Sequence, residues 1–151
     1  MELVALCDTW EAKLDEVGRQ FGVATYTDYD AFLSHDMDAV ILANYWHQHA
    51  PLAIKALEAG KHVMSECAAC HTLAEGVALA RAVEKSGVVY MFAENVPYTA
   101  YNQEMRRLYR EGAIGEFRYG EGEYVHPDPP EVKMGRSPGY DHRRNWIPAT
   151  Y

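Results

Sequence analysis

The chain has 151 residues, a formal net charge of −8 and a hydrophobic share of 48%. This size and composition are typical of an ordinary soluble globular protein with a sizeable core. Because binding to nucleic-acid phosphates needs clustered Lys and Arg, the excess of acidic residues argues against a nucleic-acid partner. No apolar run approaches the roughly 20 residues of a membrane span, and the N-terminus lacks the layout of a signal peptide. We therefore expect a cytoplasmic protein without a membrane partner.

The chain contains one C-x-x-C-H motif, formed by Cys67, Cys70 and His71. This motif attaches c-type haem, and a C-x-x-C pair alone can be a redox pair or half of a zinc site. Haem attachment would require export, and a zinc site needs two further ligands, which no second cysteine pair supplies. We interpret these residues as small side chains that follow a strand, and we predict no metal site.

Short apolar runs alternate with amphipathic stretches, which is the pattern of a parallel sheet covered by helices. The run AVILA at 39–43 is the clearest buried strand. The apolar runs together predict strands at 3–7, 23–26, 39–43, 62–64 and 88–92, with a short helix at 29–33.

Three longer helices are expected between these strands. The first ends at Gly22, the second has Pro51 in its first turn and ends at Gly60, and the third begins with a capping box of Thr72 and Glu75. The spacing of apolar residues predicts the buried faces of the first and third of these helices as Trp10, Leu14, Val17 and Phe21, and as Leu73, Val77, Ala80 and Val83.

The character of the sequence changes after Asn95. Residues 98–111 resemble a helix that ends at Gly112, and 116–126 resemble a long strand. From Pro127 onward the chain is rich in Pro, Gly and Arg and shows little periodicity.

The chain lacks a glycine-rich turn after its first strand. A complete Rossmann unit opens with a strand and a G-x-G-x-x-G turn, which lets the backbone approach a pyrophosphate at a helix N-terminus. Here the only G-x-G, Gly120 to Gly122, lies inside a predicted strand. Asp8, however, stands at the end of the first predicted strand of this chain. In a complete Rossmann unit, the acidic residue that binds the ribose stands at the end of the second strand. We expect strand one and its loop to lie upstream of Met1, so that a central strand is missing and the sheet is split.

These features predict an α/β fold: a truncated Rossmann-type parallel sheet without its first strand and glycine loop, followed by the start of an α+β domain. The strand predicted at 116–126 and the irregular segment after it cannot bury an apolar face by themselves. This favours a second domain of which the sequence contains only the beginning. The expected domains are a partial dinucleotide-binding domain over 1–95 and, over 96–151, a linker helix with the beginning of a substrate-binding sheet.

Polar and aromatic residues follow the predicted strands, where ligands bind in sheets of this kind. Asp8 is a candidate to bind the adenosine ribose, which would favour NAD over NADP because a carboxylate repels a 2′-phosphate. Alternatively, Asp8 caps the next helix, with Glu11 completing the box. Asn44, Tyr45 and Trp46 are candidates to cover the nicotinamide ribose, or they are loop packing.

Further candidates follow the later strands. His49 is a candidate for cofactor contact or a cap of the helix near Pro51. Glu66 and Asn95 stand at the ends of the next two strands, where cofactor contact is expected.

Tyr124 and His126 are the catalytic candidates, because residues two apart in a strand leave the same face. A histidine titrates near neutral pH, so it can accept a hydroxyl proton as hydride leaves the same carbon, and a tyrosine beside it could relay that proton. The alternative is a pair of exposed side chains on a half-covered sheet. His142, Arg143 and Arg144 could clamp a polyhydroxy or anionic substrate, or form a flexible basic loop.

Four segments carry a resemblance to a known family: ALCD at 5–8, AVILANYWHQHAPLAIKALEAGKHVMSE at 39–66, AEN at 93–95 and REGAIGEFRYGEGEYVH at 110–126. They resemble the Gfo/Idh/MocA group, which comprises glucose-fructose oxidoreductase, inositol dehydrogenase and relatives. The resemblance implies NAD or NADP in the N-terminal domain and a sugar or cyclitol against an open sheet in the C-terminal domain. It also implies a homo-oligomer that pairs through that sheet.

One segment departs from most dehydrogenases of this group, which carry Glu-Lys-Pro with a lysine that assists proton transfer. The matching positions here are Glu66, Cys67 and Ala68, and a thiol near neutral pH cannot replace an ammonium. The NAD-dependent α-N-acetylgalactosaminidases of the same superfamily also lack the lysine, and they resemble this chain at ENVPY and GEGEYVH. This resemblance implies that Tyr124 and His126 face the sugar. It also implies cofactor contacts at Glu66, Cys67 and Glu94.

The sequence thus predicts an NAD-dependent enzyme of an oxidoreductase family that acts on a sugar by hydride transfer at a ring carbon, with NADP less favoured. One alternative is a redox-neutral glycoside hydrolase, which oxidises C3, eliminates the glycosidic group, adds water and reduces the sugar again. A second alternative is a non-catalytic sugar- or cofactor-binding protein or an inactive fragment.

Overall fold

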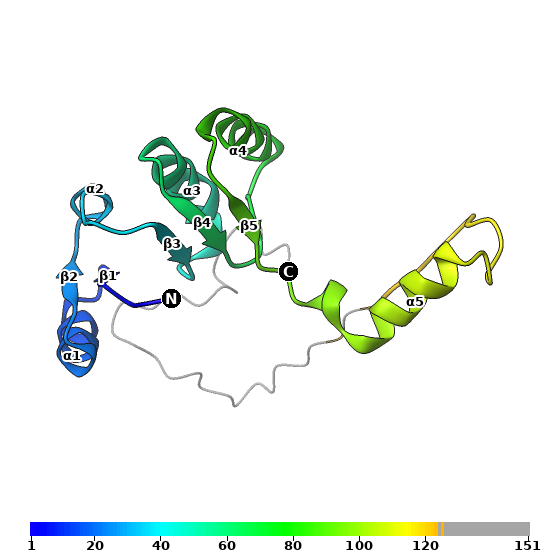
Figure 1. The fold of residues 1–151 in the computed structure, drawn as a ribbon, viewed down its shortest axis with the longest axis horizontal. Coiled ribbons are helices and arrows are strands. Elements are labelled where there is room, and N and C mark those ends of the chain that lie inside the picture. Colours follow the sequence, from blue (N-terminus) through cyan, green and yellow to red (C-terminus); the bar gives the residue numbers. More distant parts are fainter. Residues whose placement is uncertain (124, 126–151) are drawn as a thin grey trace. The chain divides into compact units, whose positions relative to one another are not determined.

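Parallel strands alternate with helices along the chain, as the computed structural model shows for residues 1–123 and 125 (Figure 1). The strands are β1 (Ala5–Cys7), β2 (Ala24–Tyr26), β3 (Ala39–Leu42), β4 (His62–Ser65) and β5 (Tyr90–Phe92). The helices are α1 (Glu11–Phe21), α2 (Tyr29–Leu33), α3 (His49–Glu58), α4 (Leu73–Ser86) and α5 (Ala100–Arg110), with 3-10 turns η1 (Trp46–Gln48) and η2 (Val96–Tyr98). This order confirms the predicted α/β class.

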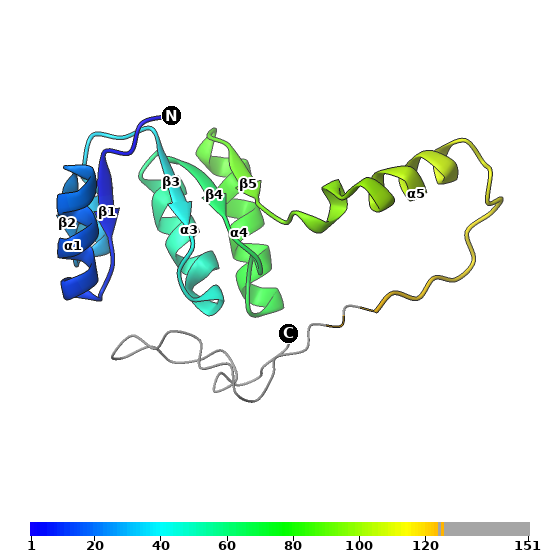
Figure 2. The same cartoon turned by 90° about the horizontal axis from the view of Figure 1, so that it is seen from below.

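The strands form two separate sheets, as the sequence predicted. β1 pairs with β2 in parallel, and β3, β4 and β5 form a three-stranded parallel sheet in the order β3-β4-β5 (Figure 2). No ladder joins β1 to β3. In the Rossmann order 3-2-1-4-5-6, the strand that would lie between them is the central first strand.

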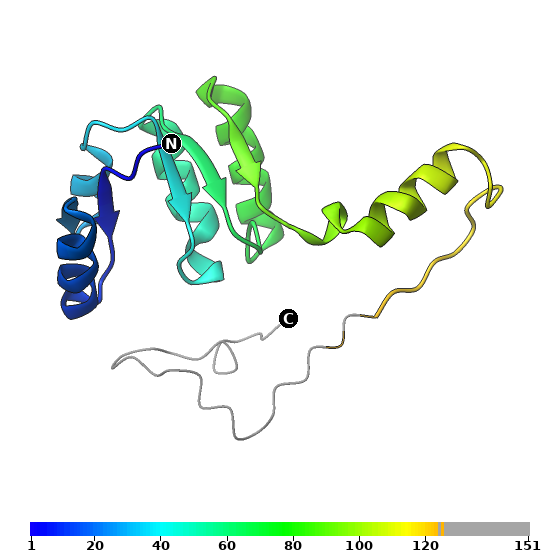
Figure 3. The same ribbon diagram turned by 60° about the horizontal axis from the view of Figure 1, so that its bottom comes forward.

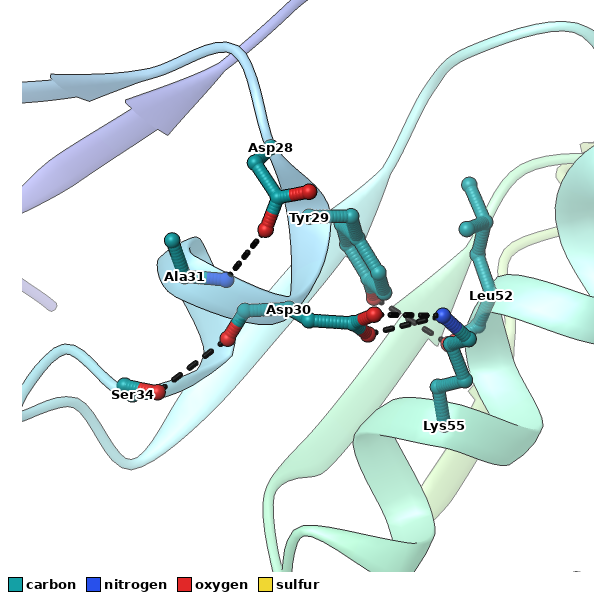
Figure 4. Close-up of polar contacts among 7 residues, drawn as sticks. All are labelled: Asp28, Tyr29, Asp30, Ala31, Ser34, Leu52 and Lys55. Carbon is teal, nitrogen blue, oxygen red and sulfur yellow. Dashed lines mark hydrogen bonds and ion pairs between the residues drawn. The ribbon is translucent and has the colours of Figure 1, made fainter.

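Helix α2 connects the two sheets through contacts with α3 (Figure 4). The Tyr29 hydroxyl donates to the Leu52 carbonyl at 3.1 Å, and the Lys55 ammonium lies 2.7 Å from the Asp30 carboxylate. Both charged groups are exposed, so this ion pair contributes little free energy. Burial of apolar side chains in one cluster provides most of the cohesion; its fully or largely buried members are Ala5, Phe32, Val40, Leu42, Ala50, Ala53, Ala56, Leu57, Val63 and Leu79.

The β3–β5 sheet has one covered face and one open face. Helices α3 and α4 cover one face (Figure 3). Val40, Leu42 and Val63 are buried in one cluster with residues of these two helices. On the other face, Ile41 pairs in register with Met64, which pairs with Met91, and their exposed fractions are 53%, 39% and 48%. Parallel sheets are normally covered on both faces, so this apolar row is a surface that a complete α/β sheet would bury.

The predicted helix ends agree closely with the structure. Gly22 is the C-cap of α1, and Gly60 and Gly112 follow within two residues of the last residues of α3 and α5; all three are in the left-handed conformation, where a residue without Cβ is unstrained. The capping box of α4 is confirmed: the Thr72 hydroxyl accepts from the Glu75 N–H at 3.1 Å, and the Glu75 carboxylate accepts from the Thr72 N–H at 2.9 Å.

Two predicted helix faces were partly wrong. In α4, Leu73, Val77 and Ala80 are exposed, whereas Leu79 is buried against α3, with Ala82 and Val83 beside it. α4 carries apolar residues on more than one side, so periodicity could not select the side that packs. In α1, Leu14 is buried but Phe21 is 57% exposed.

The chain divides into two units, 1–113 and 114–151. The predicted strand at 116–126 is not formed over its described residues 116–123, because a strand requires a hydrogen-bonded neighbour and none of the described strands pairs with this segment. Tyr124, His126 and the segment from Pro127 lie outside the described residues. No helix in the described part of the chain has the length and apolar character needed to cross a membrane.

We predict that Thr72→Ala lowers the free energy of unfolding by about 1 kcal/mol, because the substitution leaves the Glu75 N–H at the start of α4 without its acceptor. Thr72→Ser keeps that acceptor and serves as the control. Urea denaturation of the two variants is the measurement. Equal stability of the Ala and Ser variants would contradict the capping assignment.

Candidate functional site

Polar residues follow each strand of the three-stranded sheet at its carboxyl end. Parallel pairing continues one residue beyond the strands: the Glu66 N–H donates to the Leu42 carbonyl at 2.9 Å, and the Ala93 N–H donates to the Ser65 carbonyl at 2.8 Å. The segments that begin with Asn44, Glu66 and Glu94 therefore leave the same edge of the sheet side by side. This edge is where open α/β sheets bind their ligands.

The side chains at this edge are anchored by short local hydrogen bonds. The Asn44 amide donates to the Gln48 side-chain oxygen at 3.2 Å. The Glu66 carboxylate accepts from the Cys67 N–H at 3.3 Å, and the Glu94 carboxylate accepts from the Val96 N–H at 3.0 Å. Asn44 and Glu66 are exposed despite these bonds, as is Asn95 after β5, and Glu94 is half-buried. The side chains of Asn44, Glu66 and Glu94 are thus each oriented by their own loop and reachable from solvent.

An aromatic contact joins the loop after β3 to the loop after β4. The Trp46 and His71 rings meet edge to face, with centroids 4.7 Å apart. Tyr45 stacks on His47 at 5.8 Å. Tyr45 and Trp46 were predicted from the sequence as site candidates, whereas His71 was interpreted only as part of the C-x-x-C-H motif. The signal that could have placed His71 at the site is its position just before the capping box of α4.

His49 lies inside the protein rather than at its surface. It is the first residue of α3 and is 1% exposed. Its Nδ1 lies 2.9 Å from the Ala68 carbonyl oxygen, and its Nε2 lies 3.1 Å from the Asn44 carbonyl oxygen. Because both ring nitrogens face backbone groups, this geometry leaves neither for the direct cofactor contact that the sequence suggested. The ring is not a helix cap either, since the N-cap residue of α3 is Gln48.

Asp8 follows β1 in the two-stranded sheet. Its carboxylate accepts from the Trp10 N–H at 2.8 Å, and the side chain is exposed. The N-cap residue of α1 is Trp10, without a side-chain cap, so the suggested capping box of Asp8 with Glu11 is wrong. Burial raises the pKa of the neighbouring Cys7 thiol, and the charges of Asp8 and Asp28 raise it further.

The catalytic candidates remain predictions. Tyr124 and His126 lie outside the described residues, as do His142, Arg143 and Arg144. Cys67 and Cys70 are free thiols, both half-buried, and the described residues hold no cluster of three His, Cys, Asp or Glu side chains arranged to bind a metal.

Comparison with known proteins identifies the family. A family model described as "Oxidoreductase family, NAD-binding Rossmann fold" matches residues 1–94. The chain belongs to the Gfo/Idh/MocA oxidoreductase family. Its parallel strands, its carboxyl-edge residues and the resemblance of its motifs all agree with this membership.

Two curated relatives carry names of glycoside hydrolases. A glycosyl hydrolase family 109 protein of Shewanella baltica is 34% identical in an alignment over 137 residues, and the match covers 83% of this chain and 30% of the relative. An alpha-N-acetylgalactosaminidase of Shewanella oneidensis is 32% identical over 137 residues, with the same coverage. The chain therefore spans about a third of the length of these relatives.

A solved structure shares the fold. The WlbA dehydrogenase of Bordetella pertussis, solved in complex with NADH and UDP-GlcNAcA, superposes with a TM-score of 0.71 at 26% identity. The match covers 76% of this chain and 35% of the dehydrogenase.

We predict that the free energy of unfolding falls as the pH rises through about 8.5, the usual pKa of a cysteine thiol. Burial raises the pKa of Cys7 in the folded chain, so the unfolded chain releases this proton first, and alkaline pH favours unfolding. Urea denaturation between about pH 8 and 10 measures the effect, which should shrink in Cys7→Ala. A fall of the same size in Cys7→Ala would show that Cys7 is not its source.

Proposed function

We propose that this chain holds a nicotinamide dinucleotide for hydride transfer at a ring carbon of a sugar or sugar derivative. The observation that carries the proposal is the common carboxyl edge at which Asn44, Glu66 and Glu94 follow three paired parallel strands, in a chain of an NAD-binding family. The expectations of a cytoplasmic location and a homo-oligomer also remain proposals for the whole protein.

The residues present fit part of such a cofactor. The exposed Asp8 carboxylate follows the first strand, where it would accept the ribose hydroxyl groups of the adenosine half. The edge of β3–β5 offers amide and carboxylate groups beside aromatic rings, which suits the nicotinamide half. No G-x-G-x-x-G turn opens a helix in this sequence, so the residues of this chain offer no pyrophosphate cradle of that kind.

A bound nicotinamide would supply the hydride acceptor, and the protein would have to position the sugar carbon and remove its hydroxyl proton. Asn44 would orient the nicotinamide ribose from the loop after β3, and the ring of Trp46, held against His71, would keep water from that side. We propose Tyr124 and His126 as the pair that contacts the sugar and accepts its proton.

A redox-neutral glycoside hydrolase is the second candidate. Two observations favour it: the relatives named as hydrolases, and the residues Cys67 and Ala68, where a dehydrogenase of this family would be expected to carry Lys and Pro. A half-buried thiol beside the Glu66 carboxylate cannot supply the positive charge of a lysine. In a hydrolase the hydride removed from the sugar returns to it, so oxidation serves only to make the adjacent C–H acidic enough for elimination.

We predict that the chain binds NADH more tightly than NADPH, because the Asp8 carboxylate accepts ribose hydroxyls and repels a 2′-phosphate. Asp8→Ala should weaken NADH binding about tenfold and remove most of the preference. Asp15→Ala, which removes an exposed carboxylate from α1, is the charge-matched control. Isothermal titration calorimetry with both nucleotides is the measurement, and the absence of NADH binding by the unsubstituted chain would refute the proposed function.

We predict that Tyr124→Phe and His126→Ala abolish turnover while NADH affinity stays within about twofold. Tyr119→Phe, at an exposed tyrosine earlier in the same segment, is the control. The assay follows nitrophenyl α-N-acetylgalactosaminide in the presence of NAD. Release of nitrophenol without net NADH supports the hydrolase, whereas net NADH from a free sugar supports the oxidoreductase. Binding without either product would favour a sensor.

A further inference from the structure

His49 is the most deeply buried polar ring in the described part of the chain, and it faces two loops at once. Its Nδ1 contacts the Ala68 carbonyl at 2.9 Å, 19 residues along the chain, and its Nε2 contacts the Asn44 carbonyl at 3.1 Å. The side chain is 1% exposed, so water does not replace either partner. Buried polar groups of this kind are retained where their hydrogen bonds fix the surrounding backbone.

The two carbonyl partners only accept, so each nitrogen bonds through its own proton. A ring with protons on both nitrogens makes both bonds, and each neutral tautomer makes one of them. The two carbonyl oxygens lie 2.9 and 3.1 Å from two different nitrogens of one rigid, planar ring. In each of these forms the ring stands between the two loops, so the width of the imidazole limits how closely the loops approach each other.

The ring itself is held firmly. His49 begins α3, and the next turns of this helix place Ala50, Ala53 and Ala56 in the core with no exposed surface. The loops that the ring contacts follow β3 and β4 and carry Asn44 and Glu66 of the candidate site. The Trp46–His71 contact joins the same two loops a second time.

We propose that His49 is a positioning residue that sets the spacing of the loops after β3 and β4, and through them the placement of Asn44 and Glu66 toward the cofactor. The expected effect of His49 on NADH binding rests on the proposed function, whereas its effect on the spacing of the two loops does not depend on any ligand. His49 acts without touching the cofactor, since its ring is buried and both nitrogens face backbone carbonyls.

Three substitutions separate the two bonds. The amide nitrogen of His49→Asn can replace Nδ1 and keep the Ala68 bond, that of His49→Gln can replace Nε2 and keep the Asn44 bond, and His49→Leu keeps neither. Leu57→Ala is the control, because Leu57 is equally buried in α3 but lies away from both loops. It should lower stability without changing the loops.

The first measurement is the backbone amide NMR spectrum of the 151-residue chain without ligand. His49→Gln should shift signals of 66–71, His49→Asn should shift those of 43–47, and His49→Leu should shift both. Signals of β1 and β2 serve as the reference for folding. In the unsubstituted chain, a ring N–H of His49 should exchange slowly with solvent. Rapid exchange of that proton, or the same pattern of shifts in Leu57→Ala, would overturn the proposal even if no His49 variant folds.

The second measurement is NADH titration of the variants that fold. His49→Leu should weaken binding about tenfold and the single-bond variants less, while Leu57→Ala keeps the affinity of the unsubstituted chain. Unchanged affinity in His49→Leu would overturn the positioning role. If the unsubstituted chain binds no NADH, the proposed function fails while the loop coupling is still decided by the NMR spectra.

Discussion

The parallel register of β3, β4 and β5 is the constraint on which the candidate site depends. Each strand is only three or four residues long, yet its hydrogen bonds to the next strand fix where the chain leaves the sheet. Side chains that follow different strands are thereby brought to one edge, although they are separated by 20 to 50 positions in the sequence. Slippage of a strand by one residue would exchange its buried and exposed faces, so the buried Val40, Leu42 and Val63 hold this register.

The same core explains how two sheets without a shared ladder remain together. Apolar side chains of β1, α2, α3 and the larger sheet form one buried cluster, to which Tyr29 of α2 adds a hydrogen bond with α3. No strand of the described residues pairs with both β1 and β3, and the apolar row of Ile41, Met64 and Met91 is exposed. A βα unit that placed a strand between β1 and β3 and its helix on the open face would pair those edges and cover that row.

The carboxyl edge of the β3–β5 sheet combines rigidly held loops with exposed polar side chains, and ligand sites require both. His49 illustrates the first part, since a ring with almost no exposed surface connects two loops through their backbone. Glu66 and Asn44 illustrate the second. Cys67 beside Glu66 is the chemical departure: a thiol stands where an ordinary dehydrogenase of this family is expected to carry a lysine, and this favours the proposed redox-neutral role.

The sequence by itself determined the order of strands and helices from β1 to α5, the capping box at Thr72, the split of the sheet and the family, because apolar periodicity, cap residues and ordered motifs are local signals. It wrongly predicted a strand from residue 116, because pairing with a neighbouring strand is not a local signal. It also identified Asn44 and Glu66, since polar residues after buried strands are visible without a structure. Only the tertiary structure decided which side of α4 is buried, because that helix is apolar on more than one side. It likewise placed the His49 ring between the Asn44 and Ala68 carbonyls and brought Trp46 to His71. Those contacts join separate loops, and no local pattern records a distance across the fold.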